Sequence, residues 1–207
     1  MADRGMRWRP TRSVRTDRKI NEGHSRGLDQ ALVTTESKIR NMKTERVYAF
    51  DKDGKEITHT ISGQRDRAIL SAVNGQLKDS VITHNHPNLS GNTIAGRVGN
   101  TLSYDDVSMA IRRNVKEIRV VSNTYTYSLK RKSSDWGINS NDFVSNYNKE
   151  LQAQGIRYKV REKASSIRRG TSEYQEFADR VNNGLGHSVI KTLASKYGWS
   201  YTRKKTS

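Results

Sequence analysis

The 207-residue chain carries 38 lysine and arginine residues against 21 acidic ones, a net charge of +17, and only 32% of it is hydrophobic. Such a chain can form one modest core with polar extensions, but not a core that includes every residue. It has no cysteine, which excludes disulfides, thiolate metal sites and a cysteine nucleophile. Because no apolar run approaches the length of a membrane span or secretory signal, we expect no membrane partner.

Periodic apolar positions and turn signals predict an α/β fold. Asp51-Lys52-Asp53-Gly54 is typical of a hairpin turn, whereas Gly184-Leu185-Gly186 should break the last helix. The expected elements are a basic flexible arm at 1–27, a helix at 28–42, strands at 47–51 and 56–61, a helix at 65–77, a strand at 81–83, an inserted glycine-rich loop at 88–102, a helix at 103–114, strands at 117–122 and 124–130, and helices at 141–154 and 173–197. The core is expected at 28–131, followed by a basic, mainly helical extension at 132–207.

The positive charge is concentrated in the flanks. Residues 45–130 carry 12 basic residues against 9 acidic ones, so most of the excess lies outside them. Basic clusters bind nucleic acid by neutralising phosphates and releasing counterions, without reading the base sequence. They can also be solvated tails with no such partner. The residues expected to contact DNA or another polyanion are Arg4, Arg7, Arg9, Arg12, Arg15, Arg157, Lys159, Arg161, Arg168 and Arg169.

Two of the five histidines lie one residue apart at the end of the apolar strand Val81-Ile82-Thr83. On an extended strand end, His84 and His86 can turn their imidazoles toward one point. Zinc binds imidazole nitrogens and carboxylate oxygens, and a catalytic zinc site leaves one position open. Ser103-Tyr104-Asp105-Asp106 offers the acid downstream. The same four residues also form a helix capping box, and both interpretations can hold together.

Three elements follow one another along the chain: Glu45, then His84-Asn85-His86-Pro87, then Ser103-Tyr104-Asp105-Asp106. This pattern resembles the JAMM motif of the MPN (JAB-domain) metalloprotease family. The resemblance implies an MPN/JAB-like α/β fold, in which a mixed β-sheet is flanked by helices, and Zn²⁺ held by His84, His86 and Asp106. It also implies that Glu45 acts as the catalytic base and that Ser103 donates to a tetrahedral oxyanion. The spacer before Ser103 is longer than the family usually shows. Asp105 and Glu56 are the competitors for the roles of Asp106 and Glu45, respectively.

Two further stretches, residues 48–54 and 187–201, resemble phage minor head proteins that carry a JAB-like domain. This resemblance implies a phage or prophage origin, a virion or host protein as substrate, and a place in the virion or host cytoplasm. The implied activity is zinc-dependent hydrolysis of a peptide or isopeptide bond. The alternative is a virion structural protein that binds nucleic acid and keeps a degenerate JAB-like fold. A third hypothesis, by analogy with the related RadC-like branch of the family, is that the protein hydrolyses nucleic acid.

Two remaining aromatic or basic features have ordinary structural explanations. Tyr125, Tyr127 and Leu129 alternate as on a half-buried strand, although aromatic residues among basic ones can also stack bases. His187 is expected to be a helix-end histidine and not a remote metal ligand.

Overall fold

The computed structural model describes residues 13–57, 77–87, 101–163 and 171–206. Its elements are α1 (Ser13–Ile39), β1 (Val47–Phe50), β2 (Val81–Asn85), α3 (Tyr104–Arg112), β3 (Glu117–Val121), β4 (Tyr125–Lys130), α4 (Ser140–Lys163), α5 (Ser172–Lys196) and β5 (Ser200–Lys205). The strands form one mixed sheet in the order β1-β2-β3-β4-β5. Strands β2 and β3 are parallel, and the other neighbours are antiparallel. The expected α/β fold is therefore present.

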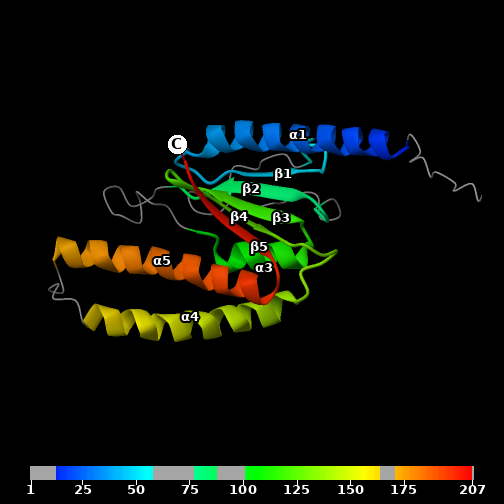
Figure 1. The fold of residues 1–207 in the computed structure, drawn as a ribbon. Coiled ribbons are helices and arrows are strands. Elements are labelled where there is room, and N and C mark those ends of the chain that lie inside the picture. Colours follow the sequence, from blue (N-terminus) through cyan, green and yellow to red (C-terminus); the bar gives the residue numbers. More distant parts are fainter. Residues whose placement is uncertain (1–12, 58–76, 88–100, 164–170, 207) are drawn as a thin grey trace, which may run out of the picture.

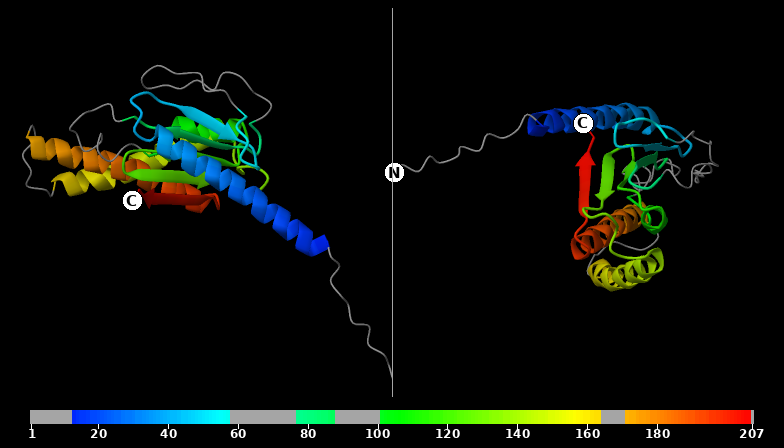
Figure 2. Two further views of the ribbon diagram at one scale, coloured as in Figure 1. Left: turned by 90° about the horizontal axis from the view of Figure 1, so that it is seen from above. Right: turned by 90° about the vertical axis from the view of Figure 1, so that its right-hand side faces the viewer.

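Helices cover both faces of the sheet. Helix α1 lies along one face, whereas α3 and α5 lie on the other, with α4 packed beyond them (Figures 1 and 2). The main core fills the α3/α5 side and includes Ile82, Val107, Ile118, Leu129 and Phe143, which are all inaccessible to solvent. A smaller apolar cluster on the α1 side consists of Leu32, Phe50 and Val81. Burial of apolar surface is thus concentrated on one side of the sheet.

Strand β2 is buried along its whole length because both of its faces are covered. Successive side chains of a strand point to opposite faces. Val81 and Thr83 contact α1, where the Thr83 hydroxyl donates to Glu36. Ile82 and His84 face the other way, Ile82 into the main core and His84 toward α3. The alternation therefore places His84 and His86 on the α3 side.

An ion-pair network joins α1 to the sheet. Arg119 of β3 contacts Glu36 of α1 through Nε at 2.5 Å, and Glu117 through Nη1 at 2.7 Å. Ser128 of β4 also donates to Glu117, at 2.7 Å. Burial lowers the pKa of Arg119, but the hydrogen bonds and charges of the two glutamates outweigh burial and raise it. Arg119 is therefore charged at any ordinary pH.

Most strands and helices begin and end within a few residues of their expected positions, and the helix at 103–114 and strands at 47–51, 117–122 and 124–130 are confirmed. The turn before Lys55 is also confirmed, since Gly54 has φ +86° and Phe50 pairs with Glu56. Most of the helix expected at 65–77, of the strand expected at 56–61 and of the loop expected at 88–102 lies outside the described residues.

Three sequence expectations were wrong. Helix α1 starts at Ser13, within the region expected to be a flexible arm, and runs through the expected boundary at residue 27. Helix α5 continues through Gly184 and Gly186. A Cβ at Gly186 would lie 3.0 Å from Thr101 Cγ2, so this glycine permits a close approach instead of breaking the helix. Finally, the region 132–207 is mainly helical, as expected, but it is not an extension outside the core, because β5 pairs with β4 and α5 contributes Val189 and Leu193 to the main core.

In the described part of the chain, no helix is both long and apolar enough to cross a membrane.

Candidate metal centre

The crossover from β2 through α3 to the parallel strand β3 brings two chain segments together at one edge of the sheet. His84 lies near the carboxyl end of β2, and Asp106 lies in the first turn of α3. Residues in crevices at the carboxyl ends of parallel strands commonly form ligand sites in α/β folds. Since His86 lies two residues beyond His84, both imidazoles project on the α3 side. The topology therefore directs both histidines toward the acidic start of α3.

The three side chains meet at distances that suit one small cation. His84 Nε2 lies 3.1 Å from His86 Nε2 and 3.2 Å from Asp106 Oδ1, and His86 Nε2 lies 3.7 Å from Asp106 Oδ2. Zinc–ligand bonds of 2.0–2.2 Å in a tetrahedron separate the ligand atoms by about 3.3 Å. The two histidines contact different oxygens of Asp106, and the spacing of these polar atoms is close to that of the ligand atoms around a tetrahedral metal.

Glu45 lies in the same cluster. One carboxylate oxygen of Glu45 and one ring nitrogen from each of His84 and His86 all lie within 4.8 Å of one another. These three residues could hold a metal ion by themselves. Asp106 also contacts both rings, at 3.2 Å from His84 Nε2 and 3.7 Å from His86 Nε2. Either carboxylate could therefore complete the donor set, and the other would then lie close to the ion.

The capping box of α3 fixes the orientation of Asp106. Ser103 is the N-cap, and its hydroxyl accepts a hydrogen bond from the Asp106 backbone N–H at 3.1 Å. In return, Asp106 Oδ2 accepts from the Ser103 backbone N–H and from its hydroxyl, each at 2.7 Å. Oδ1 is left toward His84. Ser103 therefore orients the carboxylate, and its one hydroxyl proton is directed at Asp106 and not at a substrate.

The electrostatics of this cluster are dominated by the pairing of the imidazoles with Asp106. Burial lowers the pKa of His84, but the charge and hydrogen bond of Asp106, the charge of Glu45 and a hydrogen bond to the Arg119 backbone together raise it. Burial also opposes ionisation of Asp106, yet the two histidines and Ser103 hold its pKa far below the usual range. Asp106 is thus an anionic carboxylate, as a metal ligand must be.

Asn85, between the two histidines, is a functional residue that the sequence interpretation missed. It is fully buried on the opposite side of β2. Its Oδ1 accepts from the Arg46 backbone N–H at 2.7 Å, and its Nδ2 donates to the carbonyls of Met42 at 3.3 Å and Thr44 at 3.1 Å. These bonds fix the loop that carries Glu45. The sequence signal for this role is only the position of Asn85 between the two histidines, because its burial and its hydrogen-bond partners depend on the fold.

The competing residues lie elsewhere. Asp105 is exposed on α3. Glu56 is also exposed and pairs with Phe50, which lies opposite Val81 at the start of β2, whereas Val47 lies opposite His84 at its end. Glu56 is thus at the wrong end of β1 to serve in place of Glu45. His187 lies on α5, where its Nδ1 is hydrogen-bonded to the Tyr201 hydroxyl at 2.9 Å.

The residues expected to bind nucleic acid are not placed by this structure. Six of them lie outside the described residues: Arg4, Arg7, Arg9, Arg12, Arg168 and Arg169. The other four lie in parts of α1 and α4 whose side chains are not described: Arg15, Arg157, Lys159 and Arg161.

Comparisons of the chain with protein-family models, curated proteins and solved structures found no match. The function is therefore argued from the residues and their geometry alone.

Proposed function

We propose that the protein is a zinc-dependent hydrolase of the JAMM type, with an MPN/JAB-like core, which cleaves a peptide or isopeptide bond. One observation carries this proposal. Two imidazoles and one carboxylate, from β2 and the start of α3, converge at 3.1–3.7 Å, close to the edge lengths of a tetrahedral zinc site. The single zinc ion would have His84, His86 and Asp106 as protein ligands. Phage or prophage origin and a virion or host protein substrate belong to the same proposal.

Zinc in such a site would supply Lewis acidity and a water molecule that loses its proton near neutral pH. The protein's own groups then carry the proton. Glu45, within 4.8 Å of the histidine nitrogens, is placed to accept the proton of the attacking water and to pass it to the leaving amine. Asp106 is held by Ser103, so this ligand needs little reorganisation.

Ser103 has a different role in this proposal from the one that the family resemblance implies. Its hydroxyl proton is already donated to Asp106 at 2.7 Å. To stabilise a substrate oxyanion it would have to rotate away from that carboxylate. We therefore assign Ser103 the positioning of Asp106 in the resting enzyme, with oxyanion contact only after such a rotation.

Metal content tests the proposal directly. Protein purified without chelator should contain about one zinc ion per chain, and His84→Ala or Asp106→Ala should lose most of it, because each removes one of three protein ligands. Asp105→Ala is the matched control, since this acid is adjacent but exposed, and it should keep its zinc. Folded wild type that binds no zinc at saturating concentration would defeat the enzyme proposal.

Activity tests the role of Glu45. Glu45→Gln should keep zinc and stability while reducing hydrolysis by about 10²-fold or more, the usual scale for general acid–base catalysis. Virion and host proteins would be incubated with each protein and examined for cleavage products. Equal cleavage by wild type and Glu45→Gln would remove Glu45 from the mechanism.

A second candidate function is a virion structural protein that binds nucleic acid and has lost the chemistry. The observation in its favour is that the cluster satisfies itself, since His84, His86 and Asp106 form mutual polar contacts without requiring another group. Zinc-free, folded protein that still binds DNA would support this candidate.

A further inference from the structure

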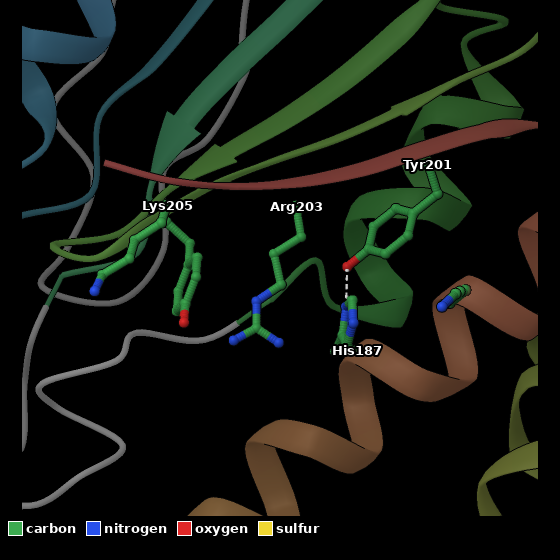
Figure 3. Close-up of a pocket in the computed structure, with 6 residues that line it drawn as sticks. His187, Tyr201, Arg203 and Lys205 are labelled. Atoms are coloured by element: carbon green, nitrogen blue, oxygen red, sulfur yellow. Dashed lines mark hydrogen bonds between the residues drawn. The ribbon is translucent and has the colours of Figure 1, made fainter. Parts of the chain in front are cut away.

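A second polar site lies at the opposite edge of the sheet from the metal centre. Among the described residues, strand β5 pairs with β4 alone, and β1 and β2 lie at the other end of the strand order. A pocket of about 440 Å³ lies between this edge and α5 (Figure 3). Its lining residues are Tyr125, His187, Lys191, Tyr201, Arg203 and Lys205. None of the six is acidic.

The strand geometry gathers these side chains. Tyr201, Arg203 and Lys205 alternate along β5, so they project from one face toward α5, as Figure 3 shows. Tyr125 pairs with Lys205 across the two strands, and the Arg203 guanidinium lies 4.0 Å from the Tyr125 ring centroid. This cation–π contact orients the planar guanidinium beside the ring. Lys191 and His187 complete the pocket from α5.

The positive charges have no acidic partner within the described residues. No carboxylate of the described chain forms an ion pair with Lys191, Arg203 or Lys205. Burial lowers the pKa of His187, and the nearby charges of Arg203 and Lys191 lower it further. Like charges held together in this way repel one another, and a bound anion would relieve the repulsion.

A hydrogen bond between Tyr201 and His187 can fix the His187 ring so that its Nε2–H serves as a donor to a ligand. Burial raises the pKa of Tyr201 to about 12, so its hydroxyl keeps its proton. The hydroxyl lies 2.9 Å from His187 Nδ1 and 3.2 Å from the Thr101 hydroxyl. A neutral His187 that accepts from Tyr201 at Nδ1 carries its own proton on Nε2. Within the described part of the chain no hydrogen bond to that N–H is found, so it can donate to a ligand.

We propose that this pocket binds a nucleotide unit, with its phosphate held by Lys191, Arg203 and His187 and its base beside the Tyr125–Arg203 pair. Arginine forks match phosphate oxygens, and bases stack on tyrosine rings and guanidinium planes. The volume suits a small ligand. The unit belongs either to a free nucleotide or to a single strand of nucleic acid, because both present the same phosphate and ring. This site is independent of the proposed hydrolysis.

The test compares two charge-matched variants of the full chain. Arg203 and Lys204 are adjacent and exposed on β5, but they project to opposite faces, and only Arg203 lines the pocket. Arg203→Gln should weaken binding of a fluorescent short oligothymidylate by about tenfold or more, as expected for loss of a charge-assisted contact. Lys204→Gln removes the same charge and should have a much smaller effect. Both variants should fold, which thermal unfolding would check.

Site-resolved binding separates the two sources. Adenosine monophosphate added to the wild-type protein should shift the His187 ring resonances in NMR spectra if the ligand is a free nucleotide. Shifts with oligothymidylate but not with adenosine monophosphate assign the strand. Inorganic phosphate should compete in either case. Unperturbed His187 signals with both probes, or equal losses in Arg203→Gln and Lys204→Gln, would overturn the proposal, since only the general charge of +17 would then be acting.

Discussion

The two faces of the sheet are held by different kinds of interaction. The face that packs on α3 and α5 is almost entirely apolar, with Ile118 and Leu129 buried there in the same core as Phe143 of α4. The face under α1 has a small apolar cluster, but its buried groups also include Glu36, Thr83, Asn85, Glu117 and Ser128, which are paired by hydrogen bonds. Hydrophobic burial is non-directional, whereas hydrogen bonds fix orientation.

This difference shows how the candidate site is supported. The apolar face provides burial under α3, whose first turn carries Asp106. The polar face fixes the positions of the loop that carries Glu45 and of helix α1. There, Asn85 holds the loop 42–46 that carries Glu45, and Glu36 holds α1 against Thr83 and Arg119. Stability and positioning are thus expected to respond to different substitutions.

The largest loss of stability should come from the apolar face. Phe143→Ala removes a fully buried ring between α4 and the core and should lower the free energy of unfolding by about 3–5 kcal/mol. Val33→Ala is the control, because Val33 is 62% exposed on α1 and should change stability by less than about 0.5 kcal/mol. Urea unfolding measures both. A small effect at Phe143 would mean that this face is not the main source of stability.

The polar face should respond in a coupled manner. Arg119→Met leaves the buried Glu36 without its cation, and leaves Glu117 with only Lys130 Nζ at 3.9 Å, and we expect a loss of about 3 kcal/mol. Adding Glu36→Met to Arg119→Met should recover part of this loss, because one uncompensated charge is removed as well. A double-mutant cycle by urea unfolding gives the coupling energy. Additive losses would contradict the network.

Asn85 links the polar face to the proposed chemistry. Asn85→Ala removes the side-chain bonds to Met42, Thr44 and Arg46 and should cost about 1–3 kcal/mol. The variant should retain its zinc, because no ligand is changed, yet its hydrolytic rate should fall as in Glu45→Gln. Zinc analysis and cleavage assays on one preparation would show this. Full activity in a destabilised Asn85→Ala protein would leave the residue a purely structural role.

Local patterns predicted the elements whose side chains alternate or repeat clearly. The capping pair Ser103 and Asp106 predicted the start of α3. The pair His84 and His86 predicted a candidate site at the end of an apolar strand. Strand β5 was missed because Ser200–Lys205 has one aromatic residue among polar and basic ones. Its place depends on pairing with β4, distant in the sequence. Pairing of this kind is not encoded by local periodicity.

The part of the site that the sequence did not predict depends on tertiary contacts. The position of Glu45 relative to His84 follows from the antiparallel register of β1 and β2, in which Val47 lies opposite His84. The role of Asn85 follows from the path of the loop before β1. Glu45 and Asn85 are residue types that are also common on surfaces and in strands without any such role. A sequence can therefore indicate ligand types, whereas the groups that position them need the fold.

The smallest expected effect concerns the attachment of α1, and it compares two helical glycines. A Cβ at Gly27 would lie 2.7 Å from the Asp53 backbone carbonyl oxygen, in the turn after β1, whereas a Cβ at Gly155 of α4 would meet nothing within 4 Å. Alanine is favoured over glycine within a helix by about 1 kcal/mol. Gly155→Ala should therefore stabilise the protein by about 0.5–1 kcal/mol. Gly27→Ala should instead destabilise it by about 1 kcal/mol, because the clash with rigid backbone outweighs the helix preference. Thermal unfolding gives both signs, and a stabilised Gly27→Ala protein would show that α1 does not pack against this turn in solution.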